Sequence, residues 1–141
     1  MFTPASARAA STYRQASIDS STPHQLVNLL LDGLLQSVRM ARASLQRGDL
    51  SAKCEQIARA VRLIEEGLRM GLDDEHGGDI AANLRRLYDY SVRRLTVANF
   101  RNDDAVMAEV QSLFETLAEG WRGIAGTPAT ALPRLSAQQG A

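Results

Sequence analysis

The sequence has little of what most catalytic and metal-binding sites are built from. Its 141 residues include one cysteine, Cys54, and two histidines, His24 and His76. A single cysteine cannot form an internal disulfide, and it is consistent with a reducing compartment. The motif Asp73-Asp-Glu-His76 lies in a glycine-bounded segment, which predicts a solvated acidic turn rather than a metal site. We therefore expect no enzyme and no cofactor, and a small metal-dependent enzyme is the weakest alternative.

Proline, aromatic residues and long apolar runs are also scarce. Nothing between Pro23 and Pro128 forbids a helix, and Leu and Ala far outnumber Val and Ile, which favours helices over strands. No apolar run approaches the about 20 residues of a membrane span. The first residues, MFTPASARAASTYRQ, lack the apolar stretch of a secretory signal. We expect a cytosolic protein without membrane insertion.

Four amphipathic helical segments are indicated by capping residues and by apolar spacing. Thr22, Pro23 and Gln25 form a capping box and a proline start, and Gly48 ends that first helix. The second helix begins at Asp49 or Ser51 and precedes an expected loop over 70–78. The third opens at Asp79, and its apolar stripe is Ile80, Leu84, Leu87, Tyr88, Ser91, Leu95 and Ala98. A turn over 99–102, with Asn102 as the candidate cap, precedes the fourth helix.

These segments predict an all-α fold, an antiparallel up-down four-helix bundle. Residues 23–125 form the bundle domain. Residues 1–22 form an N-terminal arm, with a short extra helix near 7–16, and the arm carries Phe2 and Tyr13. Residues 126–141, rich in Ala, Pro, Gly and Gln, are expected to be a disordered tail.

Charge is balanced overall but segregated along the chain. The 16 basic and 16 acidic residues leave no net charge, which argues against a whole-molecule nucleic-acid binder. The third helix is basic and the fourth is acidic, so the two helices can pair as neighbours. The alternative is an adaptor that binds RNA or a regulatory protein through arginines of the third helix, namely Arg85, Arg86, Arg93 and Arg94.

Glycines interrupt three of the predicted helices. Gly33, Gly67 and Gly120 each cost about 1 kcal/mol relative to alanine in a helix interior. Two explanations stay open, namely close helix packing and an apolar groove that admits a side chain of a partner. The broad apolar face of the first helix favours the groove, and a bundle with exposed grooves is a partner-binding module.

The order and spacing of several motifs resemble the flagellin-export chaperones of the FliS family. The resemblance runs from Tyr13 to Trp121. It includes the helix start Ser20-Ser-Thr-Pro-His-Gln-Leu26, the element Leu30-Leu-Asp-Gly33 and, as the most specific stretch, Gly77-Gly-Asp-Ile-Ala-Ala-Asn-Leu84 followed by Leu87-Tyr-Asp-Tyr90. Leu31 departs from the family, which commonly has tyrosine there.

The resemblance implies a cytosolic chaperone that binds the disordered C-terminal segment of flagellin in apolar grooves. Bound flagellin would not polymerise prematurely, and the complex would pass to the flagellar type III export gate. The implied flagellin-binding residues are Leu30, Leu34, Ile80, Asn83, Leu84, Leu87, Tyr88 and Ser91, with Asn83 and Asp89 as hydrogen-bonding groups. Tyr13 would belong to an autoinhibitory arm. Whether the free protein is a monomer or a homodimer stays open.

Overall fold

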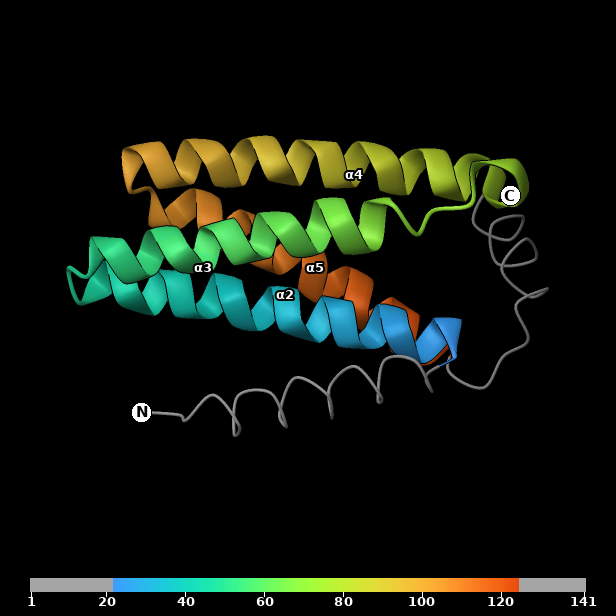
Figure 1. Cartoon of the computed structure of the whole chain (residues 1–141), viewed down its shortest axis with the longest axis horizontal. Coiled ribbons are helices and arrows are strands. Elements are labelled where there is room, and N and C mark those ends of the chain that lie inside the picture. Colours follow the sequence, from blue (N-terminus) through green and yellow to red (C-terminus); the bar gives the residue numbers. More distant parts are fainter. Residues whose placement is uncertain (1–21, 125–141) are drawn as a thin grey trace, which may run out of the picture.

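Four antiparallel helical rods make up the part of the chain that a computed structural model describes, residues 22–124 (Figure 1). The expectations for Tyr13, for the remainder of the arm and for the tail 126–141 lie outside the described residues. The segments are α2 (Pro23–Gln46), α3 (Leu50–Arg62), the π-helix η1 (Leu63–Arg69), α4 (Asp74–Arg101) and α5 (Asp104–Gly123). The predicted all-α, up-down bundle is confirmed.

The first helix begins and ends where its sequence predicts. The Thr22 hydroxyl accepts a hydrogen bond from the Gln25 amide at 3.1 Å, and the Gln25 side chain accepts one from the Thr22 amide at 3.0 Å. Pro23 occupies the first turn, where its missing N–H has no intrahelical partner to lose. Gly48 follows the helix with a φ of +77°, a backbone conformation that a residue with a Cβ adopts at a cost.

The second rod consists of α3 and η1, so it changes from an α-helix to a π-helix along its length. The Asp49 side chain caps α3 by accepting from the Ala52 amide at 3.1 Å. From Leu63 the same rod continues as the π-helix η1 to Arg69. A π-helix is rare, and short π segments occur often at functional sites. The amphipathic pattern of this segment predicts an ordinary α-helix and not η1.

Two expectations around the third helix are wrong in detail. The segment expected as a loop over 70–78 is helical from Asp74, because the Asp73 side chain caps that turn by accepting from the Glu75 and His76 amides. Gly78 then breaks the helix with φ +53° and ψ −131°, and the regular part follows. The expected turn over 99–102 is also wrong, since α4 continues through Arg101.

Asn102 is not the cap of the last helix. It ends α4 in the left-handed conformation, with a φ of +52°, and Asp103 caps α5 by accepting from the Val106 amide at 3.3 Å. The chain's one lysine holds this turn from α3. The buried Lys53 ammonium donates to the Asn99 carbonyl oxygen at 2.8 Å and to the Asn102 side-chain oxygen.

The core runs along the middle of the bundle. Helix α2 packs on α3 and α5, while α4 packs on α5, α3 and η1, so α2 and α4 lie diagonally opposite each other. Phe114 is at the centre and stacks on Tyr88, with ring centroids 6.2 Å apart. The fully buried side chains include Leu31, Leu34, Val38, Ile64, Leu95, Met107 and Val110.

Candidate functional site

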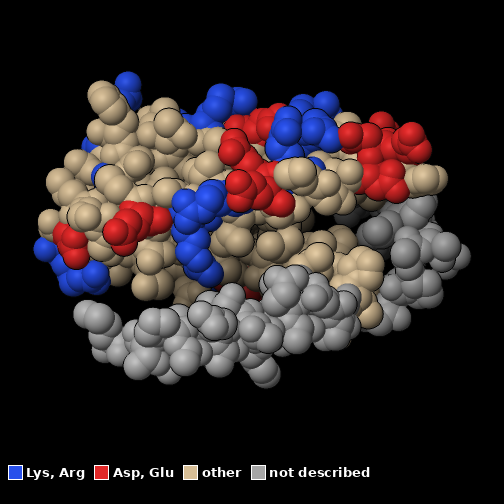
Figure 2. Space-filling model, in the orientation of Figure 1, with Lys and Arg blue, Asp and Glu red and all other residues tan. Residues whose placement is uncertain are grey.

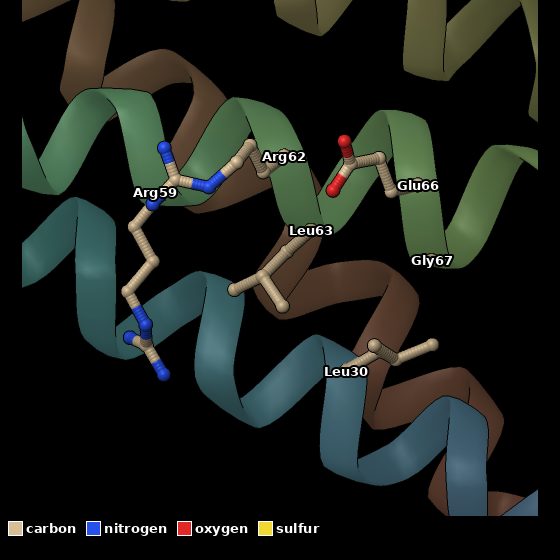
Figure 3. A pocket seen from close by; sticks show the side chains of 6 residues that line it. All are labelled: Leu30, Arg59, Arg62, Leu63, Glu66 and Gly67. Atoms are coloured by element: carbon tan, nitrogen blue, oxygen red, sulfur yellow. The ribbon is translucent and has the colours of Figure 1, made fainter.

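A hollow opens at the surface between α2 and the second rod, which consists of α3 and η1 (Figure 3). It has a volume of about 380 Å³ and crosses the point where α3 becomes η1. Leu30 reaches it from α2, and Leu63 points toward it from η1. Charged side chains and one glycine complete the lining: Arg59, Arg62, Glu66 and Gly67. We call this site the α2–η1 groove.

Two glycines seat the two leucines of the α2–η1 groove in a reciprocal way. A Cβ on Gly67 would lie only 2.8 Å from Leu30 Cδ2, so the leucine occupies the space left by the missing side chain. A Cβ on Gly33 would lie 3.5 Å from Leu63 Cδ1, which is ordinary contact. Gly67 therefore serves close packing. Around Gly120 no atom of the described residues beyond its own stretch of helix lies within 4 Å of an added Cβ, so packing among these residues does not require a glycine there.

Arg59 fixes one edge of the groove. Its guanidinium donates to the hydroxyl of the buried Ser37 at 2.6 Å and to the Gly33 carbonyl oxygen at 3.3 Å, both on α2. These bonds tie α3 to α2 at the glycine position. The groove thus combines the apolar side chains of Leu30 and Leu63 with a charged rim, to which Glu66 also contributes, and this combination suits an amphipathic segment of a partner.

The residues expected on the third helix divide into two groups. Tyr88 and Ser91 are buried in the core, whereas Ile80, Leu84 and Leu87 are half-buried in the N-terminal part of α4. Burial raises the pKa of Tyr88 to about 12. The half-buried leucines share the face that carries the buried residues further along the helix. The other helices therefore cover this face of α4 less in its N-terminal part than further along the helix.

The remaining expected residues are placed as follows. Leu34 is fully buried on α2, and Leu30 is half-buried in the α2–η1 groove. Asn83 is exposed and accepts a hydrogen bond from Arg86. Asp89 accepts one from Arg69 of η1 at 2.8 Å. Because α2 and α4 are diagonal neighbours, the structure does not bring Leu30 together with the α4 leucines in one continuous surface.

The second rod contributes groove residues that the sequence analysis missed. Leu63, Arg59, Arg62 and Glu66 were not expected at a binding surface, although Gly67 had been singled out as a glycine in a helix interior. An amphipathic pattern shows which residues face inward, but it does not show where two helices separate enough to leave a hollow. Gly67 and Gly33 were the available pointers, since each lies against a leucine of the groove.

The arginines of α4 are largely engaged within the protein. Arg94 donates to Glu109 of α5 at 2.9 Å, and Arg85 pairs with Asp74 at 2.5 Å. The Arg94 guanidinium lowers the pKa of Glu109, and that carboxylate in turn raises the pKa of Tyr90, whose hydroxyl donates to it at 2.8 Å. The expected pairing of the third and fourth helices is confirmed at Arg94. Two of the four arginines of the RNA alternative are thereby used in ion pairs.

The histidine motif is a helix cap. Asp73 Oδ2 lies 2.8 Å from His76 Nδ1, while Asp73 Oδ1 caps the first turn of α4. The same hydrogen bonds lower the pKa of Asp73. Within residues 22–124, no three His, Cys, Asp or Glu side chains gather in a way that could hold a metal ion. In the same range, no helix is both long and apolar enough to cross a membrane.

Comparison with known proteins matches this bundle to one family over most of its length. The family described as "Flagellar protein FliS" matches residues 6–128. The "Flagellar secretion chaperone FliS" of Salmonella typhimurium is 45% identical over 116 residues, which cover 79% of this chain and 86% of that protein. The chain belongs to the FliS family.

Other FliS relatives agree with this assignment. The "Flagellar secretion chaperone FliSB" of Pseudomonas aeruginosa is 39% identical over 121 residues, covering 83% of this chain and 95% of that protein. The "Flagellar secretion chaperone FliS" of Escherichia coli is 36% identical over 108 residues, which cover 77% of this chain and 79% of that protein. FliS is a family of chaperones and not of enzymes. The resemblance inferred from the sequence motifs is confirmed.

Proposed function

We propose that this protein binds the disordered C-terminal segment of flagellin in the cytosol, prevents its premature polymerisation and passes it to the flagellar type III export apparatus. The family membership supports the chaperone role. The observation that supports a groove-bound client is the α2–η1 groove, where an apolar floor opens to the surface beside the anchored Arg59.

The arrangement of the apolar surfaces favours a long client over a compact one. The α2–η1 groove lies on the side of α2, and the half-buried Ile80, Leu84 and Leu87 lie on α4, the diagonal neighbour of α2. One segment that contacts both surfaces has to pass around the bundle. A disordered client loses conformational entropy when it is ordered, so it needs a large interface to reach useful affinity.

Tyr13 and the N-terminal arm complete the proposal. The arm would cover part of the apolar surface when flagellin is absent, and Tyr13 would anchor it there. Flagellin would displace the arm on binding. Removal of residues 1–21 should then tighten flagellin binding, because the client no longer competes with the arm. Equal affinity of the truncated and full chains would contradict this part.

Calorimetric titration with a peptide of the C-terminal segment of flagellin from the same cell tests the proposal. We expect one-to-one binding with submicromolar affinity and a large negative heat-capacity change, since folding of the peptide buries apolar surface. Absence of binding to the full chain, with the bundle shown to be folded by circular dichroism, would overturn the assignment of the client.

Substitutions locate the binding surface within the same experiment. Leu84→Asp and Leu87→Asp place a charge on the half-buried face of α4, and we expect them to abolish binding. Leu50→Asp is the matched control, since Leu50 is 47% exposed at the first residue of α3, at the opposite end of the bundle. A folded Leu84→Asp variant with full binding would show that this face does not hold the client.

A further inference from the structure

The outward face of α4 carries a second surface, which the α2–η1 groove does not include. Arg86, Arg93 and Phe100 follow one another at intervals of seven residues, so they lie in line along α4, about 10 Å apart. All three side chains are exposed, and Phe100 is 88% exposed. We call this line of residues the outer stripe. The exposed Arg101 follows it directly at the end of the helix.

The arginines of the outer stripe differ from the other arginines of the same helix. Arg85 and Arg94 each pair with a carboxylate, whereas no ion pair of the described residues involves Arg86, Arg93 or Arg101. Asp89, the nearest acid along the stripe, is already bonded to Arg69. Figure 2 shows basic and acidic groups side by side along the upper edge of the molecule, where α4 lies in Figure 1. Because its arginines make no ion pair among the described residues while Asp89 is paired with Arg69, the stripe is a locally cationic surface on a chain without net charge.

We propose that the outer stripe binds an acidic segment of a second protein, which sets two carboxylates against Arg86 and Arg93 and an apolar side chain against Phe100. Arginine and aromatic side chains are enriched at the centres of protein interfaces. The stripe lies on the side of α4 that faces away from the core. The acidic partner and a client in the α2–η1 groove can therefore be bound at the same time.

The surroundings of the stripe favour an acidic protein over RNA. Binding of single-stranded RNA needs several free aromatic faces for stacking, and Phe100 is the one fully exposed aromatic ring among the described residues. The nearby Tyr90 donates its hydroxyl to Glu109, and it lies under Arg94 at 6.0 Å from the ring centroid.

Photocrosslinking from position 100 of the full chain, in the cell that produces it, tests the proposal. A benzophenone-bearing phenylalanine replaces Phe100, and mass spectrometry identifies the attached segment. We expect a protein segment in which Asp and Glu exceed Lys and Arg. The double substitution Arg86→Glu and Arg93→Glu should remove this crosslink. Arg47→Glu with Arg122→Glu, which makes the same charge change at exposed arginines away from the stripe, should retain it.

The identified segment is then synthesised and titrated against the purified chain. Reversal of Arg86 and Arg93 should weaken its binding about tenfold, while flagellin binding stays unchanged. A crosslink to RNA, a crosslink to flagellin itself, or an equal affinity of the two double variants for the segment would overturn the proposal. Because flagellin binding is measured separately, failure of the outer stripe leaves the proposed chaperone role intact.

Discussion

The indole N–H of Trp121 donates a hydrogen bond to the backbone carbonyl oxygen of His24 at 3.0 Å, and the two aromatic rings stack with centroids 4.9 Å apart. This contact joins the last turn of α5 to the first turn of α2. The carbonyl belongs to the second residue of α2, and the ring lies flat on the imidazole, with 12° between the planes. Trp121 thus holds the first and last described helices together.

Trp121→Phe separates the hydrogen bond from the stacking. A phenyl ring can still lie on His24, but it has no N–H to donate. We expect the free energy of unfolding to fall by about 1 kcal/mol. Urea titration should be followed by far-UV circular dichroism, since Trp121 is the one tryptophan of the chain and its fluorescence is lost. An unchanged unfolding midpoint would show that the hydrogen bond contributes nothing.

The glycines at 67 and 120 should respond differently to alanine. Gly120→Ala meets open space and should raise the free energy of unfolding by about 0.5–1 kcal/mol through helix propensity. Gly67→Ala places a Cβ 2.8 Å from Leu30 Cδ2, so Leu30 has to move. We expect Gly67→Ala to be less stable than Gly120→Ala by about 1 kcal/mol or more. Thermal unfolding of both variants tests this prediction. An equal increase in the free energy of unfolding of both variants would contradict the packing of Leu30 on Gly67.

Asn102 should be sensitive to loss of its side-chain oxygen. Glycine adopts the observed φ of +52° without strain, so Asn102→Gly removes the acceptor for Lys53 while the turn is preserved. We expect the free energy of unfolding to fall by about 1 kcal/mol, because a buried ammonium loses a partner. Asn102→Asp keeps an acceptor and serves as the control. Guanidinium titration of both variants tests this prediction. A glycine variant with the same free energy of unfolding as the parent protein would contradict it.

The ion pair of Arg42 with Asp104 should make the free energy of unfolding depend on pH in the acid range. Arg42 Nε donates to Asp104 Oδ1 at 2.8 Å, and this hydrogen bond lowers the pKa of Asp104 in the folded state. The unfolded state therefore takes up the proton first as the pH falls below about 4. The pair stabilises the fold above that pH, and its contribution is lost below it.

Asp104→Asn should remove this part of the pH dependence and cost at most about 1 kcal/mol at neutral pH, because the carboxylate is partly exposed. Unfolding of the parent and the variant is compared between pH 2 and pH 7. The control is Asp32→Asn, an exposed carboxylate that makes no ion pair among the described residues. Parallel stability curves for parent and Asp104→Asn would contradict the prediction.

The sequence predicted helix boundaries well where local residues specify the backbone conformation without a competing neighbour. Thr22, Pro23 and Gln25 specify a helix start, and Gly48 supplies a positive φ. Where two neighbouring residues can both cap the same helix, the sequence does not decide which of them does. Asn102 and Asp103 are both good caps, and the left-handed conformation at Asn102 places Asp103 as the cap of α5. The helical turn at Asp74 was missed because Gly77 and Gly78 suggested a loop.

The candidate site was harder to predict, because it depends on spacing between helices. The family resemblance grouped Leu30 and Leu34 together as client-binding residues, yet one lines the α2–η1 groove and the other lies in the core. The π-helix η1 has no sequence pattern that distinguishes it from an α-helix over seven residues. The groove arises where Leu63 and Gly67 meet α2, which only the packed structure reveals.

The contact between Trp121 and His24 also has a topological consequence. It places the start of α2 beside the end of α5. A short linker between these two points would close the bundle into a ring. New termini could then be opened at the exposed Gly48 turn, at the opposite end. Such a circular permutant would keep all four helical rods while moving both chain ends away from the Trp121 contact.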